Sequence, residues 1–392
     1  MVISSRLRAD CRFFRGDRPC VFKLSSCRRC RHFSPLGRRI LIIKLSATGD
    51  VLRTTPLLFG LKKKYPLSHI TWLTDYPAFY LLKGNPLIDR LLCYNGETAD
   101  YLRSREFDLV ACFDKEERAT ALASSLRARA KAGFGIDRHS GAVCALNRAS
   151  RYAFLLGVCD DLKFRSNRKT YQEIIFESVG LKYRGERYIL PLTSEEKERA
   201  GEFLSGLGIK RGDPLIGVNT GAGDAFAHKA WDERGFVSLV EMISGRMPES
   251  SILLLGGRKE AGLNARLALK FSGGKVYDCG GYHSLPRFAA IIGRCSALVS
   301  GDTTAMHIAI ALRVPVAAVF GSTCENEIDF YGRGAKVVSS LDCRPCYRKE
   351  CGKTPNCMDS ISAGEVFSVL SALLILSPGN PRALARGAPQ EQ

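Results

Sequence analysis

Short, uninterrupted apolar runs alternate with amphipathic stretches over most of the chain. The first such run, residues 39–45, contains four consecutive aliphatic residues, and a strand without polar alternation is typical of a parallel sheet covered on both faces. A polar turn at 46–50 and a helix at about 51–64 follow it. The order then repeats, with predicted strands at 69–74, 88–93 and 107–113 and predicted helices near 76–83, 98–103, 116–131 and 167–179. Strands and helices in alternation predict an α/β doubly wound domain.

A second alternating series begins after a polar connection at about 183–213. Its predicted strands lie at 215–219, 251–255, near 276, at 297–300 and at 314–321, and its predicted helices lie at 232–244, after 258, at 284–293, after 304 and at 362–376. Because single cores rarely grow beyond about 250–300 residues, we predict two domains, at 37–185 and 186–376. A basic, cysteine-bearing arm at 1–36 precedes them, and a disordered tail at 377–392 follows.

The strand that ends at Gly301 leads directly into a helix, with Asp302, Thr303 and Thr304 in the turn. A helix N-terminus at the carboxyl end of a parallel strand presents unpaired backbone N–H groups and a positive dipole end to an anion, usually a phosphate. Thr303 and Thr304 add hydroxyl donors, Asp302 can accept a hydrogen bond from a sugar hydroxyl, and His307 lies one turn further on. The simpler alternative is that Asp302 only caps the helix and His307 is a core residue.

Each series has a polar, glycine-bearing turn after its first strand. Ligands of doubly wound sheets lie outside the carboxyl ends of the strands. Two facing domains would therefore place Asp50 opposite the 220–231 loop and the 301–307 turn. The sequence thus predicts an active site in a cleft between the domains.

The chain has 58 Lys and Arg against 39 Asp and Glu, a formal net charge of +19. A basic surface of this kind attracts nucleic acid, anionic lipid headgroups or acidic small molecules, and charge alone does not choose among them. No apolar run approaches the roughly 18 residues that a membrane span requires, and the start of the chain is polar. We therefore expect a cytoplasmic protein.

The fifteen cysteines need a separate explanation, because a reducing cytoplasm argues against a disulfide framework. Eight of them form two clusters with one Cys-x-x-Cys pair each: Cys11, Cys20, Cys27 and Cys30, and Cys343, Cys346, Cys351 and Cys357. Four thiolates can close a structural zinc site that leaves no position open for chemistry. The alternatives are free or transiently oxidised thiols, or an iron–sulfur cluster. The first site would clamp the arm to the next domain, and the second would stiffen a loop near the cleft.

Three segments, taken in order, resemble glycosyltransferase family 9, the ADP-heptose:lipopolysaccharide heptosyltransferases. They are residues 40–52 with Thr54-Thr55-Pro56, the Lys229-Ala230-Trp231 element, and Gly301-Asp302-Thr303-Thr304 with His307. The resemblance covers about residues 38–376 and implies a GT-B fold, in which two Rossmann-like doubly wound domains face a central cleft. It implies an acceptor-binding first domain and a nucleotide-sugar-binding second domain. It also implies inverting, metal-independent transfer of a sugar, with heptose from ADP-heptose and a lipopolysaccharide or related glycan acceptor as the leading choice.

On this resemblance Asp50 matches the proposed base of the family, which removes a proton from the acceptor hydroxyl. The alternative is that Asp50 only caps the following helix. Lys44, Thr48 and Gly49, from the same strand and turn, are assigned to the acceptor side.

On the donor side, Lys229 would meet the diphosphate charge together with the N–H groups of the helix that follows Thr303. No Asp-x-Asp pair lies near the donor loop to hold a metal ion there, so we expect no catalytic cofactor. Thr220 would add a hydroxyl, and Glu260 matches a position that can hold the ribose, although a charged helix start also explains it.

Two departures from the family pattern leave the nucleotide and the sugar open. Thr304 stands where the family commonly has Gly, and the loop at 221–224 lacks a Pro-Gly start. A lipid-linked or polysaccharide acceptor would place the protein peripherally at the inner face of the cytoplasmic membrane, where anionic headgroups suit its basic surface. Two other functions are a nucleotide-sugar epimerase of similar fold and a zinc-containing nucleic-acid-binding protein. Against the latter, no aromatic stacking motif accompanies the cysteines.

Overall fold

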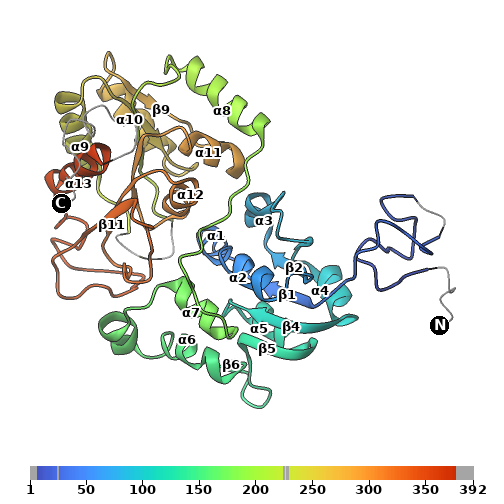
Figure 1. Ribbon diagram of the computed structural model, residues 1–392. Helices are drawn as coiled ribbons and strands as arrows, with labels where there is room; N and C mark the ends of the chain where they lie inside the picture. Colours follow the sequence, from blue (N-terminus) through green and yellow to red (C-terminus); the bar gives the residue numbers. More distant parts are fainter. Residues whose placement is uncertain (1–6, 24–25, 224–225, 227–228, 377–392) are drawn as a thin grey trace, which may run out of the picture.

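The protein consists of two α/β domains, each built on one six-stranded sheet (Figure 1). The computed structural model describes residues 7–23, 26–223, 226 and 229–376, so the tail predicted at 377–392 lies outside the described residues. The first sheet takes its strands from residues 39–145 and the second from residues 215–338. The predicted α/β architecture with two doubly wound domains is confirmed.

The first sheet has the strand order β3-β2-β1-β4-β5-β6, and its strands are parallel except for β6, which pairs antiparallel with β5. In the central strand β1, Ile40 and Ile42 belong to the core on one face of the sheet, whereas Leu41 and Ile43 belong to the core on the other. This two-sided burial explains the unbroken apolar run in the sequence. The strands are β1 (Arg39–Ile43), β2 (His69–Thr74), β3 (Arg90–Cys93), β4 (Glu106–Cys112), β5 (Arg127–Ile136) and β6 (Val143–Ala145).

Helices cover both faces of the first sheet and carry the chain between its strands. They are α1 (Thr48–Thr54), α2 (Leu57–Lys64), α3 (Tyr76–Leu82), α4 (Gly96–Arg103), α5 (Glu117–Ser125), η1 (Arg148–Ser150), α6 (Arg151–Leu155), η2 (Asp161–Ser166) and α7 (Tyr171–Ser178). The described part of the arm, 7–23 and 26–36, extends from this domain on the side away from the second domain (Figure 1).

The second sheet has the order β12-β11-β10-β7-β8-β9 and is parallel throughout. Its last helix begins with a capping box, in which the side chains of Ser362 and Glu365 each accept a hydrogen bond from the other's backbone N–H. The elements are α8 (Ser194–Gly206), β7 (Leu215–Asn219), α9 (Glu233–Arg246), β8 (Ser251–Leu255), α10 (Ala261–Lys270), β9 (Val276–Asp278), α11 (Leu285–Ile292), β10 (Ala297–Gly301), α12 (Thr304–Leu312), β11 (Val316–Phe320), β12 (Gly334–Val338) and α13 (Ala363–Ile375).

Two helix predictions in the first domain were wrong in extent. The helix expected at 51–64 is two helices, because Pro56 has no N–H to continue the first one. The helix expected at 116–131 ends at Ser125, and the residues from Arg127 onward form β5 instead. Ala, Arg and Lys in 127–132 favour a helix, but pairing with β4 overrides that preference.

The domains meet through α1 and α12, which lie next to each other in Figure 1. Leu52 of α1 is part of the same core cluster as Met306 and Ile308 of α12. Further along the boundary, the backbone N–H of Tyr171 donates to the carbonyl of Glu327 at 3.1 Å. Within the described residues, no helix has the length and apolar character needed to cross a membrane.

Candidate active site

A cavity of about 770 Å³ lies between the domains, outside the carboxyl ends of both sheets. The predicted cleft is therefore present. It brings together most of the residues singled out in the sequence: Gly49 and Asp50 from the first domain, and Lys229, Glu260, Asp302, Thr303, Thr304 and His307 from the second.

The start of α12 forms the floor of this cavity on the second domain. Thr303 is the N-cap residue, which corrects the alternative that Asp302 caps the helix, and the Thr303 side chain makes no cap bond to the helix. Its hydroxyl lies instead 3.0 Å from Ser300 Oγ, and Asn219 Nδ2 donates to it at 3.3 Å. Among the described residues, no side chain makes a hydrogen bond to the first-turn N–H groups, which remain available to an anion.

Charged groups surround this helix start. Lys229 Nζ lies 3.5 Å from Asp302 Oδ2, and His307 Nε2 lies 4.0 Å from Asp302 Oδ1. Burial, reinforced by the charge of Arg53, lowers the pKa of His307 to about 4, so its imidazole is neutral at pH 7. The ammonium of Lys229 therefore supplies positive charge on this wall, while His307 contributes only a neutral ring.

Gly49 marks a close approach of the two domains. A Cβ atom at this position would lie 2.4 Å from Cδ2 of His307. The other side of the imidazole is held by Tyr188, whose hydroxyl lies 3.3 Å from His307 Nδ1. The sequence analysis assigned Gly49 to acceptor binding, which stays a prediction; what the structure shows is that the missing side chain lets α1 pack against His307.

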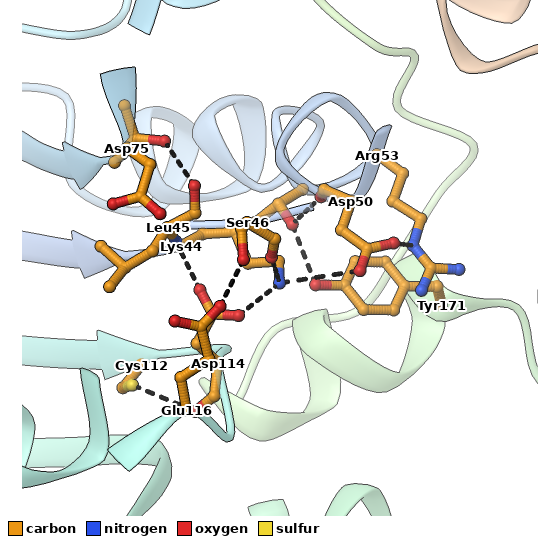
Figure 2. Close-up of polar contacts among 12 residues, drawn as sticks. Lys44, Leu45, Ser46, Asp50, Arg53, Asp75, Cys112, Asp114, Glu116 and Tyr171 are labelled. Atoms are coloured by element: carbon orange, nitrogen blue, oxygen red, sulfur yellow. Dashed lines mark hydrogen bonds and ion pairs between the residues drawn. The ribbon is translucent and has the colours of Figure 1, made fainter. Parts of the chain in front are cut away.

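Asp50 projects from α1 toward the cleft and lies between two cations (Figure 2). Its Oδ1 is 2.9 Å from Arg53 Nε, and its Oδ2 is 3.7 Å from Lys44 Nζ. Burial by itself would raise the pKa of Asp50, but the charges of Arg53 and Lys44 outweigh it and lower that pKa to about 2. Ala47 is the N-cap of α1 and Asp50 is the third residue of the helix, so Asp50 does not cap α1.

Lys44 is almost fully buried and connects Asp50 to the core of the first domain. Its ammonium lies 2.7 Å from Asp114 Oδ1 and also donates to the backbone carbonyl of Ser46 (Figure 2). Three acceptors thus surround one cation, and the charges of Asp50 and Asp114 raise the pKa of Lys44 despite the opposing effect of burial. Lys44 thus holds the Asp50 carboxylate in place, and it also lines a second cavity on the side of the first domain.

A second cavity, of about 560 Å³, adjoins Asp50 on the side of the first domain. Asp50, Arg53 and Lys163 line both cavities. Asp50 therefore stands where a ligand in one cavity would meet a ligand in the other. Lys115 and Lys163 add positive charge to the second cavity, and among the described residues neither lies within ion-pair distance of a carboxylate.

Three other predicted residues have different surroundings. Thr220 is buried, with its hydroxyl 2.7 Å from Asn264 Oδ1. Thr220 and Thr48 are not among the described residues that line the two large cavities. Glu260 does line the cleft, where its carboxylate accepts a hydrogen bond from the N–H of Gly257 at 2.7 Å.

Several residues in the cleft were not predicted from the sequence. Arg53 could have been suspected, because it lies one helical turn after Asp50. Glu327, Lys163 and Tyr347 reach the cavity from segments without a recognisable motif, and only the fold brings them there.

The two cysteine clusters lie outside the cleft, each around a small cavity of about 20 Å³. Cys343, Cys346, Cys351 and Cys357 all line one of these cavities, and Cys11, Cys20, Cys27 and Cys30 all line the other. Among the residues that the structure describes, no three His, Cys, Asp or Glu side chains stand as a ready metal site. The thiols of each cluster thus share a cavity without forming a coordination shell.

A family model described as glycosyltransferase family 9 (heptosyltransferase) matches residues 97–356. The chain belongs to glycosyltransferase family 9. This family 9 glycosyltransferase is 24% identical over 347 residues to lipopolysaccharide heptosyltransferase 1 of Pseudomonas aeruginosa, a match that covers 81% of this chain and 88% of that one. It is also 24% identical over 322 residues to lipooligosaccharide heptosyltransferase 2 of Haemophilus ducreyi, over 78% and 89% of the two chains.

Solved structures share the fold of this family 9 glycosyltransferase. A glycosyl transferase family 9 structure from Veillonella parvula has a TM-score of 0.69 at 22% identity, covering 87% of this chain and 98% of that chain. The E. coli ADP-heptose lps heptosyltransferase II has a TM-score of 0.63 at 18% identity, covering 86% and 98%. The expected GT-B fold and the expected enzyme class are confirmed.

Proposed function

We propose that this glycosyltransferase moves a heptose from ADP-heptose to a lipopolysaccharide core or a related glycan. The observation that carries the proposal is the position of Asp50, where a cavity lined by Lys229 and the start of α12 meets a second cavity in the first domain. The relatives suggest the substrates, since the P. aeruginosa protein is a lipopolysaccharide heptosyltransferase and an E. coli heptosyltransferase of the same fold was solved with ADP.

In the proposed reaction, Asp50 accepts the proton of an acceptor hydroxyl while the hydroxyl oxygen bonds to the anomeric carbon of the donor sugar. The bond from that carbon to the nucleoside diphosphate breaks at the same time, and the diphosphate leaves with the electron pair. Attack and departure occur on opposite faces of the sugar, so the anomeric configuration inverts.

Asp50 must become more basic when the substrates bind, because a carboxylate with a pKa of about 2 is a weak proton acceptor. About a third of its side chain, 35%, is exposed in the free protein. An acceptor in the second cavity would remove this water, and desolvation favours the protonated acid. A donor diphosphate would also offset the positive charges that lower the pKa of Asp50.

Negative charge develops on the departing diphosphate, and groups of the second domain can stabilise it. The first-turn N–H groups of α12 and the ammonium of Lys229 face the same cavity. Fixed donors of this kind stabilise developing charge without reorganisation. They support transfer that uses protein groups in place of a metal ion at the diphosphate.

The acceptor proposed for the second cavity carries negative charge. Lys115 and Lys163 line this cavity, as do Asp114, Glu116 and Glu327. Burial and the nearby charge of Lys163 lower the pKa of Lys115 despite the opposing charge of Glu327. An anionic group on the acceptor, a phosphate or a carboxylate, would relieve the repulsion between these two cations. Core glycans that carry such groups fit this charge pattern.

The test is a panel of nucleotide sugars, scored by thermal stabilisation of the protein and by transfer to core glycans. A ligand that binds only the folded state raises its stability, and we expect ADP-heptose to stabilise the protein most. Lys229→Ala should weaken donor binding about tenfold, the effect of losing roughly 1.4 kcal/mol, while Lys197→Ala on the exposed face of α8 should not. A different preferred sugar, or a product that keeps the donor's anomeric configuration, would contradict the proposal.

We further propose that the enzyme works at the inner face of the cytoplasmic membrane. On the first domain, the exposed apolar residues Phe59 and Leu67 flank Lys63 and Lys64, which are exposed as well. Anionic headgroups attract such a basic and apolar surface, at about 1 kcal/mol per nearby Lys or Arg.

A further inference from the structure

The loop at 343–357 gathers four cysteine side chains around one small cavity. Cys343, Cys346, Cys351 and Cys357 all line it, and its volume of about 20 Å³ has room for one small ion. Arg344, Arg348 and Lys353 line it as well. These cations can balance the charge of several thiolates, which on binding a divalent ion would keep a net negative charge.

Both ends of this cluster are anchored at the end of β11. The carbonyl of Ser322 accepts hydrogen bonds from the N–H of Cys346 at 3.1 Å and of Tyr347 at 3.0 Å. Gly321 leaves room for the other end, since a Cβ atom there would lie 2.8 Å from Cys357 Sγ. Residues 343–346 and Cys357 are thus brought to one point by the second sheet.

The loop carries Tyr347 into the active-site cleft. Tyr347 lines the large cavity, and its hydroxyl accepts a hydrogen bond from the N–H of Cys324 at 3.0 Å. Its ring stacks on Phe164, with 5.6 Å between the centroids, and Lys163 Nζ lies 3.8 Å from its centre. The position of this loop therefore decides where Tyr347 stands against Lys163, the residue that lines both cavities.

Apolar packing alone does little to hold the loop. Residues 343–356 contain no helix or strand, and all of them are exposed or half-buried. Segments that bury so little apolar surface depend on cross-links or metal ions for their order.

We propose that Cys343, Cys346, Cys351 and Cys357 bind a structural Zn²⁺ ion that fixes the loop and thereby positions Lys163 and Tyr347. The ion draws the four sulfurs into a tetrahedral shell, and each thiol releases its proton to solvent. The loop has no open coordination position in this arrangement, so the ion takes no part in sugar transfer. Only the consequence for the cleft rests on the proposed function.

A second, independent cavity supports the same assignment for the arm. Cys11, Cys20, Cys27 and Cys30 line it together, and none of the described residues at 7–23 and 26–36 is fully buried. The turn N–H of Cys30 donates to the carbonyl of Cys27 at 3.3 Å, which brings this Cys-x-x-Cys pair to one side of the chain. Arg12 Nη1, 3.3 Å from Asp89 Oδ1, attaches the arm to the first domain. The arm therefore takes a second Zn²⁺ ion.

Metal content of the full chain, purified under reducing conditions and without chelators, tests both sites. We expect two Zn²⁺ ions per chain. The double variant Cys351→Ser/Cys357→Ser should retain one ion, as should Cys27→Ser/Cys30→Ser, and the matched control Cys93→Ser on β3 should retain both. The proposal would be overturned if the wild-type protein contained no metal and bound none when Zn²⁺ or Co²⁺ was added. It would also be overturned if the protein contained iron and acid-labile sulfide in place of zinc.

Trypsin provides a second measurement on the wild-type protein, so that a poorly folding variant does not decide the outcome. Arg348, Lys349 and Lys353 are cleavage sites within the loop. Removal of the metal with a chelator should speed cleavage there at least tenfold, and added Zn²⁺ should restore protection. Equal cleavage with and without metal would contradict the assignment, whatever the sugar donor proves to be.

The effect on the cleft has its own readout. Cys351→Ser/Cys357→Ser should raise the KM for the nucleotide sugar, because Tyr347 is released, whereas Cys27→Ser/Cys30→Ser should leave that KM unchanged. If Cys351→Ser/Cys357→Ser lost its metal ion but kept the wild-type KM, the ion would not position Tyr347, although the metal site itself would stand.

Discussion

Asp50 owes its character to groups from several parts of the first domain. Arg53 comes from the same helix and Lys44 from the preceding strand, while Asp114, after β4, fixes Lys44 from the other side. The carboxylate is therefore kept ionised and aimed at the cleft before any substrate arrives.

Asp50→Asn should reduce sugar transfer by a factor of about 10²–10⁴, the usual contribution of a general base. The amide keeps the size of the side chain but cannot accept the proton. Donor affinity, measured by calorimetry, should change little, because the groups proposed to meet the diphosphate, Lys229 and the start of α12, belong to the second domain. Asp100→Asn, on the exposed face of α4, is the control, and turnover equal to that of the wild type in Asp50→Asn would remove Asp50 from the mechanism.

His307 should make the stability of the fold depend on pH. Its pKa is about 4 in the folded protein, against an ordinary value of 6.5. The unfolded chain therefore binds more protons between pH 6.5 and 4, so stability is complete above this window and falls as the pH is lowered through it. The loss from this one group is roughly 3 kcal/mol.

Urea unfolding at pH 7 and pH 4 measures the effect. In His307→Gln the fall in unfolding free energy between the two pH values should be smaller than in the wild type. The exposed residue His139 provides a control, since His139→Gln should leave the fall unchanged. If stability fell as much in His307→Gln as in the wild type, the pH dependence would come from other groups. One such group is His69, because burial lowers its pKa as well.

At the residue scale, the sequence could identify groups that lie in short local motifs. Asp302, Thr303 and His307 occupy one turn and one helix, so their spacing alone places them together. Lys163 and Tyr347 are 184 positions apart in the printed sequence and meet through cation–aromatic contact. No local pattern encodes such a pair, because it depends on how the two domains face each other.

At the scale of elements, the contact between α1 and α12 allows the least change in side-chain size. Gly49 on α1 lies against the imidazole of His307 on α12, with no space for a methyl group. Both helices begin at the carboxyl ends of strands, which is why both reach the cleft.

Gly49→Ala should separate these helices or displace His307. Overpacking of this kind costs typically about 1–3 kcal/mol, so the melting temperature should fall and transfer activity should drop. Gly96→Ala at the start of α4 is a matched control, since a Cβ there meets nothing within 4 Å. A Gly49→Ala protein with wild-type melting temperature and activity would show that the helices adjust without cost.

Elements were predictable where pattern and burial agree, as in β1 and in α13 with its capping box. They were not predictable where pairing with a neighbour decides the conformation. Arg127 to Lys131 have helix-forming side chains, yet they complete the sheet beside β4. The half-buried edge strand β12 has no apolar run, and it forms because β11 offers it a free edge.

At the scale of the whole molecule, the formal net charge of +19 favours binding to an anionic surface. If the basic surface of the first domain serves membrane binding, full-length protein should co-sediment with vesicles that contain anionic lipid. Binding should weaken with salt, because charges separated by more than about 10 Å are screened at 0.1 M.

Lys63→Glu/Lys64→Glu should lose most of this vesicle binding. Lys197→Glu/Lys210→Glu, exposed on the second domain, should keep it and serves as the control. Binding to neutral vesicles that equals binding to anionic ones, or equal losses in both variants, would argue against a docking face on the first domain.

The wall shared by the two large cavities has a thermodynamic consequence. Asp50, Arg53 and Lys163 belong to both, so a ligand in either cavity changes the field that a ligand in the other experiences. The two binding equilibria are then linked, and any factor by which the sugar donor alters acceptor affinity must equal the factor by which the acceptor alters donor affinity. The first substrate to arrive thereby sets how strongly the second is held.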